Sequence, residues 1–212
     1  CFVAAPIPQY FTSLAEHLPA DQHAVLLLVA PHSEAGMRDM VAQHGGQVTY
    51  RKTADEVASS HKTLLEYTWN HTTLHALKVD KGLTYIQSGF NPMHRLKQVK
   101  ALEAALKGEV MMHLEFLRTK EGAFNCSGLQ IIRYTTEERL NQIMQIYRDH
   151  GVQINNPHAY IVEDGKQNHL DPAVVGMKRR FDPQGLLNPG KLRSWYAAGS
   201  TAPAQPPVRQ TA

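Results

Sequence analysis

A histidine and a tyrosine stand two residues apart after an Asn-Pro pair, in the segment Asn155-Asn156-Pro157-His158-Ala159-Tyr160. The Asn-Pro pair opens a strand that we predict over residues 159–162, and alternate residues of a strand project to one face. Together His158 and Tyr160 could remove a proton from a substrate hydroxyl, so both are candidate catalytic residues. A strand edge with a solvent-facing histidine explains the pattern equally well.

A second polar segment contains Trp69, Asn70, His71 and His75. The two histidines are four residues apart, so they would share a face if the preceding helix continued. This is a metal-ligand spacing, but no glutamate follows His71 as the zincin motif requires. We therefore predict no metal and favour structural or substrate-pocket roles for Asn70, His71 and His75. A polar connection between a helix and a strand is the alternative.

A third pair, His113 and Glu115, lies on one face of a strand predicted over residues 110–117. The two side chains could line a pocket, so His113 is a further substrate-pocket candidate. A solvated face of the sheet is the simpler explanation of the pair. A metal-dependent hydrolase that uses His71, His75 and His113 is a rival hypothesis.

Apolar spacing and end signals predict the elements that would position these residues. Capping boxes begin helices at Thr53 and Thr135, and prolines follow the caps Asn91 and Asp171. The predicted strands cover residues 24–30, 47–51, 83–87, 110–117, 129–133 and 159–162. The order of helices and strands predicts an α+β fold, in which helices pack on one face of an antiparallel sheet.

Composition excludes several classes of protein. The 212 residues are 42% hydrophobic and 19% charged, as in a globular domain. With a formal net charge of +3, the chain is too balanced to indicate nucleic-acid binding. No apolar run approaches the ~20 residues of a membrane helix, and the two cysteines form neither a disulfide framework nor a zinc ribbon. We expect a cytoplasmic location, with peripheral attachment to a membrane left open.

The most particular string in the chain is KRRFDPQGLLNPGKL, residues 178–192, in which two Pro–Gly turns enclose a Leu-Leu pair. It resembles the C-terminal signature of FAD-linked oxidases of the vanillyl-alcohol oxidase and para-cresol methylhydroxylase superfamily. The D-lactate dehydrogenases and the flavin subunits of glycolate oxidase are its familiar members. A helix followed by two solvent-exposed turns would explain the prolines alone.

The resemblance implies a ferredoxin-like cap domain over residues 21–196, preceded by a short segment at residues 1–20 and followed by a disordered tail at residues 197–212. It implies FAD as cofactor, a small-molecule substrate, and a partner FAD-binding domain that lies N-terminal to the cap in the same or parent chain. The Asn-Pro-Gly turn would return to that domain, which makes Asn188 the candidate flavin contact. A homodimer is left open, and so is the electron acceptor.

The resemblance also implies the reaction, in which a hydroxy acid or alcohol is oxidised by hydride transfer to flavin. In the metal-using members, a Glu-His-Gly motif lies near residue 158 and a His-x-Gly-Asp-Gly-Asn-x-His motif lies near His113. Neither string occurs in this chain. His158 would stand in for the histidine of the first motif. The alternative is a non-catalytic ferredoxin-like module for ligand binding or oligomerisation.

Overall fold

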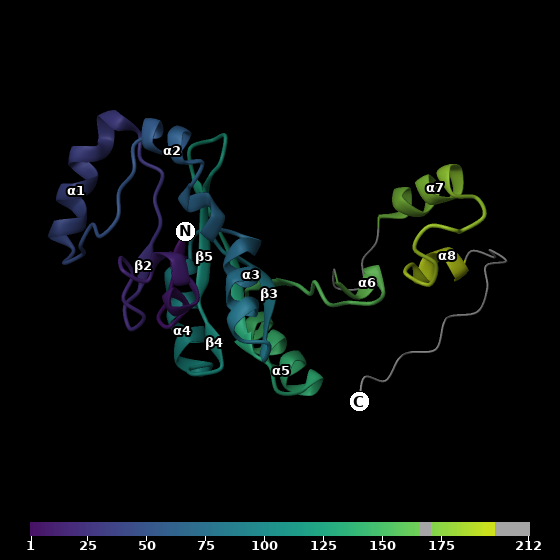
Figure 1. Cartoon of the computed structure of the whole chain (residues 1–212). Coiled ribbons are helices and arrows are strands. Elements are labelled where there is room, and N and C mark those ends of the chain that lie inside the picture. Colours follow the sequence, from purple (N-terminus) through teal and green to yellow (C-terminus); the bar gives the residue numbers. More distant parts are fainter. Residues whose placement is uncertain (166–170, 198–212) are drawn as a thin grey trace. The chain divides into compact units, whose positions relative to one another are not determined.

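The computed structural model describes residues 1–165 and 171–197 (Figure 1). The chain divides into two compact units, the first from Cys1 to Gln153 and the second from Ile154 onward. Of the tail that we predicted to be disordered, residues 198–212 lie outside the described residues. Among the described residues, no helix is long and apolar enough to cross a bilayer.

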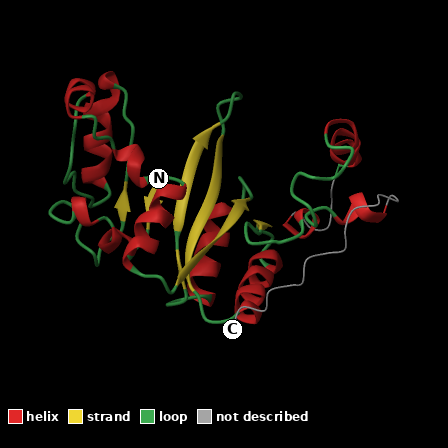
Figure 2. Ribbon diagram, turned by 45° about the vertical axis from the view of Figure 1, so that its right-hand side comes forward, coloured by secondary structure: helices red, strands yellow, loops and turns green. Residues whose placement is uncertain are grey.

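An antiparallel sheet is the framework of the first unit (Figure 2). Its strands follow the order β2-β1-β5-β6-β3-β7, and β4 pairs with β6. The longest pairing joins β3 to β6, from Leu83 opposite Arg133 to Phe90 opposite Cys126. The strands are β1 (Phe2–Val3), β2 (Ala24–Val25), β3 (Leu83–Phe90), β4 (Val110–Met111), β5 (His113–Arg118), β6 (Phe124–Arg133) and β7 (Gln153–Asn155).

The helices of the first unit are α1 (Glu34–Gln43), α2 (Ala54–Ser60), α3 (Asn70–Val79), α4 (Arg95–Ala105) and α5 (Glu137–Asp149). Those of the second are α6 (Val162–Gly165), α7 (Pro172–Phe181) and α8 (Arg193–Ala197). The capping box of Thr53 and Glu56 is confirmed. Helix α5 begins one residue later than predicted, because Thr136 rather than Thr135 accepts a hydrogen bond from a backbone N–H, that of Arg139. Asp171 caps α7 as predicted.

Helices cover both faces of the sheet, which corrects our prediction of helices on one face. Met111 packs in the core cluster that includes Ala76 of α3. The next residue, Met112, accepts a weak hydrogen bond from Tyr147 of α5, with 3.9 Å between Oη and Sδ. Met112 lies between β4 and β5, and the pairing with β6 keeps one register from Met111 opposite Ile131 to Leu114 opposite Gly128. Side chains therefore alternate through Met112, and α3 and α5 lie on opposite sides of the sheet. The mixed architecture with an antiparallel sheet is confirmed.

Two predicted strands of the first unit differ in the structure. Only Ala24 and Val25 of residues 24–30 form a strand, and Leu28 is 79% exposed. Hydrogen bonds to the segment of β1 continue as far as Leu26, which pairs with Cys1, and residues 27–30 pair with no strand among the described residues. Residues 47–51 form no strand, and all of them are exposed or half-buried.

Gly128 on β6 is required for a buried polar contact within the sheet. A Cβ at this position would overlap Nε2 of Gln130 and Oγ of Ser88. Gln130 Nε2 donates to Ser88 Oγ at 2.8 Å, and Ser88 Oγ donates to Gln130 Oε1 at 3.0 Å. Gly128→Ala is therefore expected to lower the free energy of unfolding by about 1–3 kcal/mol, since it breaks this buried pair.

Chemical denaturation followed by circular dichroism measures this effect. The matched control is Gly36→Ala in α1, where an added Cβ meets nothing within 4 Å. It should leave stability unchanged or raise it slightly, because alanine favours the helix. Equal stability of the wild type and Gly128→Ala would contradict the prediction.

Candidate functional site

The predicted pocket residues of the first unit cluster around the start of α3. The helix begins at Asn70, so His71 and His75 do lie on one helix. Asn70 and His71 are exposed. His75 is half-buried, donates from Nε2 to the carbonyl oxygen of Glu66 at 3.0 Å, and stacks on Tyr67 with 4.8 Å between ring centroids. The two histidines therefore face different surroundings.

His113 and Glu115 on β5 are buried, which corrects the expectation of a solvated sheet face. His113 is 0% exposed and Glu115 is 6% exposed. The imidazole lies between the carbonyl oxygen of Leu129, 3.2 Å from Nδ1, and Glu115 Oε1, 2.9 Å from Nε2. They are buried because α3 and the residue before it, Trp69, cover this part of the sheet.

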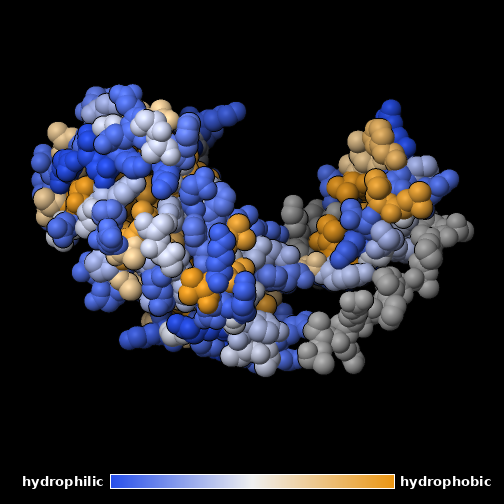
Figure 3. Space-filling view, in the orientation of Figure 1, coloured by the Kyte–Doolittle hydropathy of each residue, from blue (hydrophilic) through white to orange (hydrophobic). Residues whose placement is uncertain are grey.

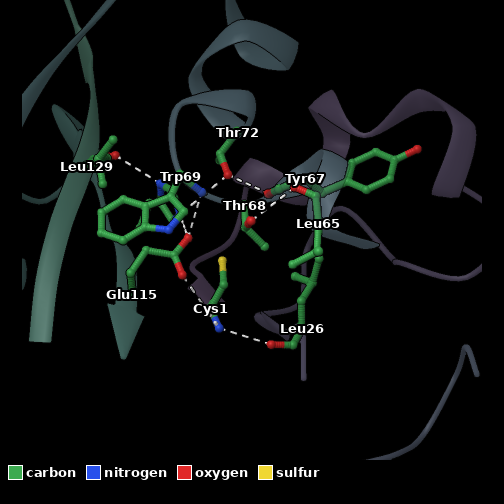
Figure 4. A network of polar contacts seen from close by, with 10 residues as sticks. Cys1, Leu26, Leu65, Tyr67, Thr68, Trp69, Thr72, Glu115 and Leu129 are labelled. Atoms are coloured by element: carbon green, nitrogen blue, oxygen red, sulfur yellow. Dashed lines mark hydrogen bonds and ion pairs between the residues drawn. The ribbon is translucent and has the colours of Figure 1, made fainter. Parts of the chain in front are cut away.

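Trp69 ties the start of α3 to β5 (Figure 4). Its backbone has a φ of 50°, and its N–H donates to Glu115 Oε1 at 2.8 Å. Burial raises the pKa of the Glu115 carboxyl, but the hydrogen bonds from His113 and Trp69 outweigh it, so the pKa lies below its usual range. Glu115 is therefore ionised at neutral pH. The indole ring of Trp69 remains 42% exposed beside this buried pair.

Cys1 completes the cluster. Its backbone nitrogen donates to the carbonyl oxygen of Leu26 at 3.0 Å and lies 3.9 Å from Glu115 Oε2. Thr72 of α3 donates to Tyr67 O at 2.6 Å, and its hydroxyl oxygen lies 3.4 Å from His113 Nε2. Sequence reasoning missed Cys1, and it considered Glu115 only as a neighbour of His113 that could line a pocket. The available signal was a charged pair within an otherwise apolar strand.

A shallow pocket lies elsewhere in the first unit. It has a volume of about 360 Å³ and is lined by residues that include Asn91, Asn125, Ser127 and Gln153. None of the predicted site residues lines it. Burial raises the pKa of the Cys126 thiol in its wall to about 11, so this cysteine is protonated at neutral pH and is a poor nucleophile.

The two catalytic candidates lie in the second unit, on a bend rather than on the predicted strand. The N–H of His158 donates to Asn156 Oδ1 at 3.0 Å, a local turn bond that replaces strand pairing. Tyr160 is 50% exposed, and Lys191 Nζ lies 3.5 Å from its ring centroid. The residues that follow form the short helix α6. His158 and Tyr160 are therefore not aligned by a strand.

The signature string forms a turn built around Asp182. Its carboxylate accepts hydrogen bonds from the N–H groups of Leu186 and Leu187, at 2.8 and 3.0 Å, and pairs with the ammonium group of Lys178. Gly185 has a φ of 66°, and a Cβ there would lie 3.0 Å from Trp195 Nε1, so both the backbone and the close approach favour glycine. The conformation explains both the aspartate and the glycine of the string.

Acid should loosen this turn. The hydrogen bond from Lys178 lowers the pKa of Asp182 below its usual 3.8, although burial opposes the shift. The carboxylate therefore contributes stability that is complete above pH 3.8 and is lost as the pH falls through the lower folded-state value. Fluorescence of the buried Trp195 in a Trp69→Phe background reports the change. Asp182→Asn should already show the loosened signal at pH 7.

Protonation of Glu163 should add to the same fluorescence change. Its carboxylate accepts hydrogen bonds from the N–H groups of Arg193 and Ser194, at 3.2 and 2.9 Å, which would also weaken in acid. Trp195 fluorescence is therefore measured against pH in the Trp69→Phe protein and in its Asp182→Asn derivative. The difference between the two curves gives the part of the fluorescence change that is due to Asp182. Identical profiles would show that the Asp182 carboxylate does not hold the turn.

The predicted site residues thus fall in both units. Those of the first unit are Asn70, His71, His75 and His113, and those of the second are His158, Tyr160 and Asn188. Within the described part of the chain, the rival metal trio of His71, His75 and His113 does not form a ligand cluster, whereas Cys1, His113 and Glu115 do. No family model and no curated protein matches the sequence.

Proposed function

We propose that this chain is the substrate-binding part, a ferredoxin-like cap, of an FAD-dependent oxidoreductase that oxidises a hydroxy acid or an alcohol. The supporting observation is that the loop of His158 and Tyr160 is anchored to the turn of Asn188. Lys191 carries these links, with its ammonium group over the Tyr160 ring and its carbonyl oxygen accepting from the N–H of Val162 at 2.9 Å. Its own N–H donates to Asn188 O at 3.3 Å.

A partner FAD-binding domain is supported by exposed apolar side chains in the second unit. Figure 3 shows them over α7 and the turns after it. Phe181, Leu186 and Leu187 are 67%, 72% and 65% exposed, although hydrogen bonds to Asp182 fix the backbone of both leucines. A grouped apolar surface of this kind is typical of an interaction site. It suits contact with the flavin-binding domain that the signature string implies.

The residues take separate roles in this proposal. Bound FAD would supply the hydride acceptor. The imidazole of His158 takes the proton of the substrate hydroxyl, and the Tyr160 hydroxyl hydrogen-bonds to the same oxygen. Asn188, with a φ of 48°, turns the backbone back toward the cofactor domain.

The test is to express this chain together with the coding region that precedes it and to record the visible absorption spectrum. We expect a flavin spectrum that bleaches anaerobically when a hydroxy acid or an alcohol is added. A folded, colourless protein would contradict the proposal and favour the non-catalytic ferredoxin-like module for ligand binding or oligomerisation.

A further inference from the structure

The cluster at the start of β5 brings together three side chains that can bind a metal. The Cys1 thiol sulfur, a ring nitrogen of His113 and a carboxylate oxygen of Glu115 all lie within 4.8 Å of one another. The antiparallel pairing of β1 with β5 sets Phe2 opposite Leu114 and Val3 opposite His113. One step further along this register, Cys1 comes opposite Glu115, so the arrangement follows from the sheet.

Both ring nitrogens of His113 face oxygen atoms. Nδ1 faces the carbonyl oxygen of Leu129, and Nε2 faces Glu115 Oε1. The Thr72 hydroxyl near Nε2 donates to Tyr67 O, so toward His113 it presents only lone pairs. A neutral imidazole has one N–H and cannot satisfy acceptors at both nitrogens. A metal ion between His113 Nε2 and Glu115 would place a cation where these lone pairs converge.

We propose that Cys1, His113 and Glu115 bind a divalent transition-metal ion of the Zn²⁺ class. Thiolate, imidazole and carboxylate together form a donor set that Zn²⁺ favours. The Leu129 carbonyl fixes the proton on Nδ1, which leaves the Nε2 lone pair for the metal, as in most histidine ligands. This inference does not rest on the proposed flavin chemistry, because it needs only residues of the first unit.

The geometry is within reach of side-chain rotation. Metal–ligand bonds of about 2.0–2.3 Å in a tetrahedral site place donor atoms roughly 3.3–3.8 Å apart. The 2.9 Å separation of His113 Nε2 and Glu115 Oε1 must therefore open slightly, and the Cys1 thiol must move inward from at most 4.8 Å. Three protein ligands leave a fourth position for water or a substrate atom, as in catalytic rather than structural zinc sites.

Metal titration of the purified full chain tests the proposal. After treatment with a chelator, the protein should bind one equivalent of Zn²⁺, and Co²⁺ should give the near-ultraviolet charge-transfer absorption of a thiolate ligand. Cys1→Ser should abolish that absorption and lower Zn²⁺ affinity by at least about 100-fold, beyond the effect of losing an outer-shell partner.

The chain supplies its own matched control, since its other cysteine, Cys126, lies outside the cluster. Cys126→Ala should retain both the absorption and the affinity. Cys1→Ser is preferred to a change at the fully buried His113, which risks unfolding the unit, and circular dichroism confirms that each variant is folded. A wild-type protein that takes up no Zn²⁺ would overturn the site. Unchanged binding in Cys1→Ser would overturn the ligand set.

Discussion

Replacing His158 with alanine is expected to slow reduction of the flavin by about 10²- to 10⁴-fold in the holoprotein that contains this chain. This is the usual contribution of a general base in a hydride-transfer step that also releases a hydroxyl proton. Stopped-flow absorbance under anaerobic conditions measures the rate directly. Because His158 is exposed, its loss should leave the folding of the second unit intact.

Two comparisons separate a base from a structural residue. Imidazole added to the solution should restore part of the rate of His158→Ala, since a small base can occupy the vacated space. His44→Ala, a change at an exposed histidine that ends α1, should leave the rate unchanged. A wild-type rate of flavin reduction in His158→Ala would remove His158 from the mechanism.

Local signals predicted the elements whose side chains pack in one regular pattern. The apolar spacing of Leu140, Ile143, Met144 and Tyr147 predicted α5, and all four are buried. The alternation after Leu83 likewise predicted β3. The predictions failed where pairing with another strand decides whether a segment becomes a strand. Residues 24–30 are as apolar as a buried strand, yet residues 27–30 pair with no strand in the described part of the chain.

The site was harder to predict than the fold, because its environment is made by residues distant in the sequence. His113 and Glu115 are two residues apart and share one face of a strand, as two solvent-exposed residues could. Their spacing alone therefore does not indicate burial. The cover comes from Trp69, 46 residues earlier, whose N–H reaches Glu115. The register that brings Cys1 to the same place joins strands more than 100 residues apart.

Tyr147 of α5 is the largest fully buried side chain among the described residues. Tyr147→Ala is expected to lower the free energy of unfolding by about 3–5 kcal/mol, because it leaves a cavity between α5 and the sheet. This is a large fraction of the roughly 5–15 kcal/mol that stabilises a typical domain. Chemical denaturation of the full chain followed by circular dichroism measures the loss.

Tyr147→Phe is the matched control, since it keeps the ring and removes only the hydroxyl. That hydroxyl donates to the Met112 thioether at 3.9 Å, and sulfur is a weak acceptor, so the cost should stay below about 1 kcal/mol. A large loss in both variants would show that the hydroxyl, not the packing of the ring, joins α5 to the sheet. A small loss in both would mean that α5 does not hold this face.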